Sequence, residues 1–124
     1  MIKVLLLVLL LNVVSAFEDI ILPPISSKVG EVSVLFFGQG ANLSTSQYTQ
    51  ILTDLQNACD FPLWIGIPQC PNNACAVGLK EGMERIERSM KLQGMRAKHT
   101  FYAGHSLGVA NECICRLIFS PNII

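Results

Sequence analysis

The chain has 124 residues, 51% of them hydrophobic, and its nine basic and nine acidic side chains leave no formal net charge. This balance argues against the basic surface that nucleic-acid binding requires, and it gives no reason to expect an acidic partner. The length is sufficient for one modest domain with a hydrophobic core.

Residues 1–16 have the pattern of a secretory signal peptide. Lys3 gives a positive start, Val4–Leu11 form an apolar core, and Val14-Ser15-Ala16 resemble a cleavage site. A membrane anchor is the alternative, but the apolar run is well short of the ~20 residues that span a bilayer. We therefore expect a protein that is secreted or resides in the secretory-pathway lumen, has no stable membrane span after cleavage, and folds over 17–124.

Five cysteines follow this segment, and an oxidising compartment would allow them to form disulfides. Cys70 and Cys75 bracket a Pro-Asn-Asn loop that one disulfide would close. The odd number leaves at least one thiol unpaired within a monomer. Because the cysteine spacing does not match zinc-ligand patterns, we expect no metal and no cofactor.

The first half of the domain alternates apolar runs with a helical pattern. Residues 17–28 contain adjacent prolines and serines and predict an extended segment without a clear element. Residues 31–37 are apolar and β-branched, as in a strand buried on both faces, and 61–67 form a second such run. Between them, 44–59 have helical apolar spacing and begin with residues suited to capping.

The second half continues this alternation. Residues 79–94 predict a helix with an apolar stripe on one side and pairs such as Glu81 with Arg85 on a solvated side. An apolar run at 100–103 predicts a third strand, followed by a helix-compatible segment. The order strand, helix, strand, helix, strand, helix predicts an α/β fold with a parallel sheet and no second domain.

The third strand leads into Gly104-His105-Ser106-Leu107-Gly108, which is a G-x-S-x-G pattern between a strand and a helix. Such a turn forces its central serine into a strained backbone conformation, and glycine at both flanks removes Cβ atoms that would collide. Ser106 is therefore the candidate nucleophile. The backbone N–H of Leu107, at the start of the expected helix, is a candidate donor to an oxyanion.

A second oxyanion donor is expected from the loop that follows the strand at 31–37. This loop is rich in glycine, so its backbone can approach a substrate, and Gln39 or Ala41 would supply the N–H. A dinucleotide-binding G-x-G-x-x-G motif is excluded because Leu43 occupies the position of its third glycine.

These two motifs together resemble the α/β-hydrolase family, in its secreted esterase, lipase or dienelactone-hydrolase-like branches. The resemblance covers about Glu31 to Arg116. It implies an incomplete α/β-hydrolase-like parallel sheet of about three strands with flanking helices. It also implies that Ser106 is the nucleophile, that Leu107 and either Ala41 or Gln39 donate to the oxyanion, and that the substrate is a small ester or a lipid.

The family places an Asp or Glu and then a His after the nucleophile. Beyond Ser106 the sequence contains one acid, Glu112, and no histidine. His105 is too close in sequence to reach its neighbour's oxygen, and His99 lies at the start of its strand. We therefore expect this chain alone to have little or no activity. Two interpretations remain open: a fragment of a secreted serine hydrolase, or a non-catalytic secreted binding module on a half-fold.

Asn42-Leu43-Ser44 is an N-glycosylation sequon in a chain with an expected signal peptide. Because Asn42 lies within the predicted oxyanion loop, a glycan there would block a substrate. We expect the sequon to be unoccupied.

Overall fold

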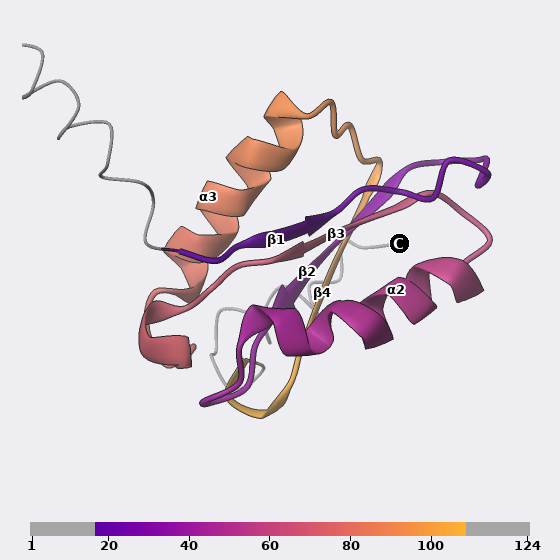
Figure 1. The fold of residues 1–124 in the computed structure, drawn as a ribbon. Helices are drawn as coiled ribbons and strands as arrows, with labels where there is room; N and C mark the ends of the chain where they lie inside the picture. The colour runs from indigo at the N-terminus through magenta and orange to yellow at the C-terminus, as the bar shows by residue number, and fades with distance from the viewer. Residues whose placement is uncertain (1–16, 109–124) are drawn as a thin grey trace, which may run out of the picture.

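A computed structural model describes residues 17–108, which form a mixed four-stranded sheet with a helix on each face (Figure 1). The strands are β1 (Ile20–Leu22), β2 (Ser33–Gly38), β3 (Leu63–Ile67) and β4 (His99–Gly104). The helices are α2 (Thr49–Ala58) and α3 (Leu79–Leu92), and the short 3₁₀ turns are η1 (Thr45–Tyr48), η2 (Pro71–Asn73) and η3 (Ser106–Gly108). The α/β class predicted from the sequence is present.

The sheet has the strand order β1-β3-β2-β4. Strand β2 pairs in parallel with both β3 and β4, so the three predicted strands are adjacent and parallel. Gly38 pairs with Gly104 at the last position of the β2–β4 register. The loop after β2 and the turn after β4 therefore begin side by side at the carboxyl edge of the sheet.

Alternate residues of each strand fill two separate cores. Val34, Phe36 and Trp64 pack with Ile86 and Met90 of α3. On the opposite face, four strand residues pack with Tyr48 of η1 and Leu52 of α2, namely Leu35, Leu63, Ile65 and Ile67. Because both faces of β2 and β3 are covered, their sequences are continuously apolar.

Strand β1 differs from the prediction that 17–28 would contain no clear element. It pairs antiparallel with β3, so the sheet is mixed and its edge is closed by a short strand. A three-residue strand is too short to show a hydrophobic period, and its position depends on contacts far along the chain. One of these is between Asp19 and Arg85, whose guanidinium donates two hydrogen bonds of 2.6 and 2.7 Å to the carboxylate.

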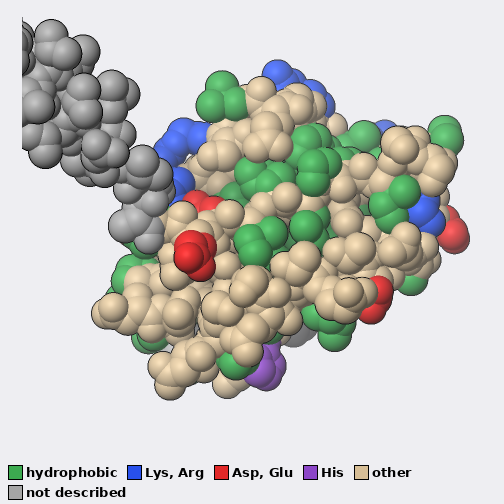
Figure 2. All heavy atoms as spheres, in the orientation of Figure 1, with side chains coloured by type: hydrophobic (Ala, Val, Ile, Leu, Met, Phe, Trp, Pro, Cys, Tyr) green, Lys and Arg blue, Asp and Glu red, His purple; other side chains and the backbone are tan. Residues whose placement is uncertain are grey.

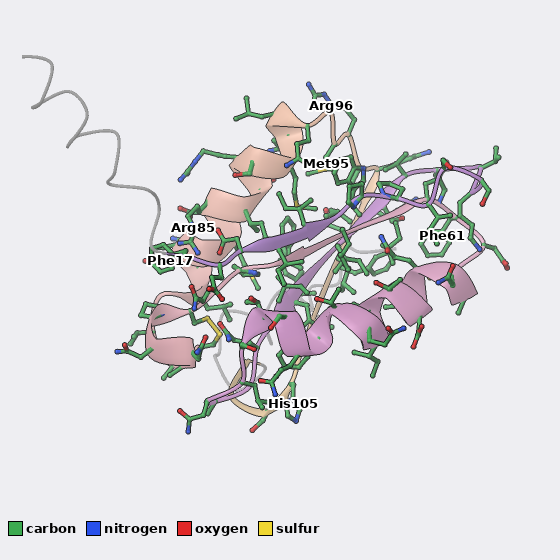
Figure 3. All side chains as sticks on the ribbon, viewed as in Figure 1. Phe17, Phe61, Arg85, Met95, Arg96 and His105 are labelled. Carbon is green, nitrogen blue, oxygen red and sulfur yellow. A yellow bond between two sulfur atoms is a disulfide. The ribbon has the colours of Figure 1, made fainter. Side chains whose placement is uncertain are left out.

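Arg85 is thus not part of the predicted pair with Glu81. Its guanidinium carbon lies 3.9 Å from the ring centroid of Phe17, and Figure 3 shows the two side chains together at the start of the described chain. The hydrogen bonds to Asp19 raise the pKa of Arg85. The ion pair of Asp19 with Arg85 and the cation–π contact of Arg85 with Phe17 therefore hold the segment before β1 against α3.

The predicted helices are present with shifted boundaries. The helix expected over 44–59 is divided into η1 and α2, and its N-cap is Ser44, whose N–H donates to Oε1 of Gln47 at 2.8 Å. The helix expected over 79–94 ends at Leu92, and Gly94 turns the chain with a φ of 96°. A left-handed residue after a helix is usually glycine because no Cβ opposes it.

Two predictions lie outside the described residues: the signal peptide over 1–16, and the helix after Gly108 with its acid Glu112. Within residues 17–108, neither helix is both long enough and apolar enough to cross a membrane.

Candidate active site

Ser106 lies on a strained turn at the end of β4. Its φ is 51°, and its side chain is exposed. The other non-glycine residues with positive φ between 17 and 108 are all asparagines, which tolerate this conformation better than serine does. The turn is closed by two backbone hydrogen bonds, from His105 to the carbonyl of Gly38 at 3.0 Å and from Gly108 to the carbonyl of His105 at 2.9 Å.

Three glycines make this turn possible. A Cβ atom on Gly104 would lie 2.8 Å from the carbonyl oxygen of Gly108, and a Cβ on Gly38 would lie at the same distance from that oxygen. A Cβ on Gly108 would overlap the backbone of Gly38. The sequence pattern identified Gly104 and Gly108. It did not identify Gly38, which belongs to a different strand and permits the same close approach.

The loop after β2, residues 39–43, contains the predicted oxyanion donors Gln39 and Ala41 and lies against this turn. The carbonyl oxygen of Gln39 would be 2.9 Å from a Cβ on Gly108, so its backbone is directly beside the turn. Ala41 is exposed further along, and its N–H donates no hydrogen bond to another residue within 17–108. Leu107 follows Ser106 in η3. The candidate donors are therefore at one edge of the sheet.

Tyr48 connects the loop to the serine turn. The N–H of Gly40 donates to the Tyr48 hydroxyl oxygen at 2.7 Å, and that oxygen lies 3.1 Å from Nδ1 of His105. Since the hydroxyl accepts from Gly40, its own proton is available to Nδ1 of a neutral His105. Figure 3 shows His105 at the end of the molecule where α2 begins, and Figure 2 shows a histidine side chain at the surface there. His105 thus contacts the loop and does not serve Ser106 as a base.

The side chain of Gln39 is fully buried and links the loop to the segment after β3. Its Oε1 accepts from the N–H of Cys70 at 2.6 Å, and its Nε2 donates to the carbonyl of Leu43 and to Oδ1 of Asn73 at 3.1 Å. Sequence reasoning considered only the backbone of Gln39. No local signal in the sequence indicates this role, because Gln39 is far along the chain from Cys70 and Asn73.

Cys70 and Cys75 are joined by a disulfide and are both buried. The other described cysteine, Cys59, is a partly buried free thiol. Asn42 of the sequon is exposed, with a φ of 59°, and its N–H donates to the carbonyl of Asn73 at 2.9 Å.

The remaining histidine is remote from Ser106. His99 begins β4 at the amino ends of the parallel strands, whereas Ser106 follows their carboxyl ends. There, Nε2 of His99 lies 2.7 Å from Oε2 of Glu31. Within residues 17–108, no histidine or carboxylate is hydrogen-bonded to Ser106, and no group of three or more His, Cys, Asp or Glu side chains is arranged to hold a metal ion.

Charged side chains do not mark a second site on the face shown in Figure 2, where acidic and basic groups are scattered. No protein-family model, curated protein or solved structure matches the chain.

Proposed function

We propose that this chain supplies the nucleophile and the oxyanion donors of a serine hydrolase that acts on carboxylic esters. The observation that carries the proposal is the positive φ of Ser106 within a turn that packs directly on the loop after β2. Acyl transfer needs an exposed serine in a strained turn with backbone N–H donors nearby, and the loop that packs on this turn carries the N–H of Ala41, unbonded within 17–108. The order of strands and the resemblance of both motifs to α/β-hydrolases support it.

In the proposed reaction, Oγ of Ser106 attacks the carbonyl carbon of the ester and loses its proton to a base. The carbonyl oxygen becomes an oxyanion, which accepts hydrogen bonds from the N–H of Leu107 and from that of Gln39 or Ala41. Collapse of this intermediate breaks the bond to the alcohol oxygen, which takes the proton back from the base, and leaves an acyl group on Ser106. Attack by water then releases the carboxylic acid and regenerates the serine.

The base is the part of this mechanism that residues 17–108 do not supply to Ser106. Loss of a triad base still leaves the acceleration provided by the oxyanion donors and binding, of the order of 10³–10⁴ over water. A small base added in solution can take the proton instead. Imidazole has the chemistry of a histidine side chain, so we expect it to increase the reactivity of Ser106.

The test is covalent labelling of the full chain by a fluorophosphonate, with and without imidazole, read by mass spectrometry of the modified peptide. We expect labelling at Ser106 that rises with imidazole concentration and is absent in Ser106→Ala. Ser46→Ala is the matched control, because Ser46 is also an exposed serine near this edge but lies in η1. It should label like the wild type.

A chain that folds but is not labelled at Ser106 in either condition would exclude the proposed reaction. Retention of a small ester or lipid by such a chain would favour the alternative from the sequence, a binding module without catalysis. Equal labelling of Ser106→Ala and the wild type would show that the probe reacts elsewhere.

A further inference from the structure

We propose that the disulfide loop, residues 70–75, is a positioning element for the oxyanion loop, residues 39–43, and that Gln39 and Asn73 transmit its effect. This inference rests on the proposed function, because it assigns the disulfide loop a role in the same reaction. The two loops are separated by α2 and β3 in sequence, and side-chain and backbone hydrogen bonds join them at the carboxyl edge of the sheet.

Gln39 makes the first connection. The oxygen of its buried side-chain amide accepts a hydrogen bond from the N–H of Cys70. The amide nitrogen donates to Oδ1 of Asn73 and to the carbonyl of Leu43. The bond to Leu43 spans the oxyanion loop from its first residue to its last. Gln39 therefore fixes the curvature of the oxyanion loop and its distance from the disulfide loop at the same time.

Asn73 makes the second connection through its backbone. Its carbonyl accepts from the N–H of Asn42 at 2.9 Å, while its own N–H donates to the carbonyl of Cys70 at 3.0 Å. The φ of Asn73 is 51°, which turns its carbonyl toward the oxyanion loop within the left-handed region that asparagine tolerates. The conformation of Asn73 thus depends on closure of the disulfide loop.

The disulfide itself anchors this support in the core. Cys70 and Cys75 pack with Leu79 at the start of α3. Closing so short a loop removes less entropy from the unfolded chain than closing a long one, so the principal effect of this disulfide is local. Without it, Cys70 and Asn73 would be free to move apart, and the hydrogen bonds from Gln39 and Asn42 would be weakened.

The consequence for reactivity follows from geometry. Oxyanion donors act only when they are fixed before charge develops, and losing one donor lowers the rate by about 10²–10³-fold. A loop that remains folded but shifts by about 1 Å loses up to about 10²-fold. We therefore expect removal of the Gln39 bonds or of the disulfide to slow labelling of Ser106 by about 10- to 100-fold.

Three variants of the full chain test this: Gln39→Met, which keeps the side-chain length but removes its hydrogen bonds, Asn73→Gly, which keeps the positive φ, and the double variant Cys70→Ala, Cys75→Ala. Amide hydrogen exchange of peptides covering 39–43 is one readout, and the imidazole-dependent labelling rate of Ser106 is the other. Met95→Ala is the control, because it opens the core beneath α3 without contacting either loop.

We expect Gln39→Met and Asn73→Gly to speed amide exchange over 39–43 and to slow labelling of Ser106. Both changes should exceed those in Met95→Ala when the variants are compared at the same free energy of unfolding. If the wild type is never labelled but exchange rises as expected, the loop support stands and the proposed reaction fails. If the wild type is labelled and neither readout changes beyond the control, the disulfide loop has no positioning role. The single-residue variants decide the matter even if the cysteine variant does not fold.

Discussion

The Tyr48 hydroxyl oxygen lies 3.1 Å from Nδ1 of His105, and this contact joins the start of the first helix to the turn that carries Ser106. The same hydroxyl accepts a hydrogen bond from Gly40. The rings of Tyr48 and His105 also meet edge to face, with centroids 6.1 Å apart. One buried tyrosine therefore holds the oxyanion loop and the serine turn in a fixed relation.

Tyr48→Phe should destabilise the chain by about 1–3 kcal/mol, because it leaves the N–H of Gly40 without its acceptor at a buried position. Chemical denaturation measures the loss. The control is Tyr102→Phe, which removes the hydroxyl of the only other tyrosine. Tyr102 stacks on Phe36 with ring centroids 5.7 Å apart, a contact that phenylalanine keeps, and its hydroxyl hydrogen-bonds to no other residue within 17–108, so removing this hydroxyl should cost less. Equal losses in the two variants would contradict the assigned role of Tyr48.

Gly108→Ala should be among the most damaging single substitutions in the described chain. Its Cβ would overlap the backbone of Gly38, so β2 and the serine turn would have to separate. We expect a loss well above the ~1–2 kcal/mol that a left-handed residue costs when its glycine becomes alanine. Gly94→Ala provides that comparison, because Gly94 has a φ of 96° and no atom within 4 Å of its Cβ position. Denaturation midpoints of the two variants should differ clearly.

The main elements of the fold could be predicted because their signals are local. Continuous apolar runs identified β2, β3 and β4, and helical spacing identified α2 and α3. Strand β1 could not be found in this way. It has three residues, and its place beside β3 depends on pairing across the chain.

The site shows the same division between local and distant contacts. The turn at Ser106 could be predicted because two nearby glycines are required by the conformation of one serine. The contribution of Gly38 and the hydrogen bonds of Gln39 could not, because they join residues that only the folded sheet brings together. Tyr48 lies within the segment 44–59 that apolar spacing predicts as a helix, and the role of its hydroxyl depends on where His105 lies.

Asp19→Ala should destabilise the chain by about 1.5–3 kcal/mol, the range for hydrogen bonds to charged groups. It removes the two carboxylate acceptors of the Arg85 guanidinium, which then keeps only its bond to the carbonyl of Gln69, and it removes the partner of the Gln69 N–H. The two charged side chains of the pair are mostly buried. Thermal or chemical denaturation measures the change.

Glu87→Ala is the matched control for Asp19→Ala, because its ion pair with Lys91 at 2.8 Å is largely exposed. Such a pair contributes about 0.3–0.5 kcal/mol. Similar losses in the two variants would mean that Asp19 does not anchor the segment before β1.

Glu31 should give the stability of this chain a component that depends on pH. Hydrogen bonds from Lys98 and then His99 lower the pKa of Glu31 below its ordinary value of 4.5. Because the folded state has the lower pKa, the contribution is fully present above 4.5 and is lost as the pH falls through the folded-state value. The difference in denaturation midpoint between wild type and Glu31→Gln should therefore disappear in acid. It should also shrink in high salt, because the ion pairs of Glu31 with Lys98 and His99 are exposed. A difference that persists below the folded-state pKa would show that the side chain acts through packing and not through its charge.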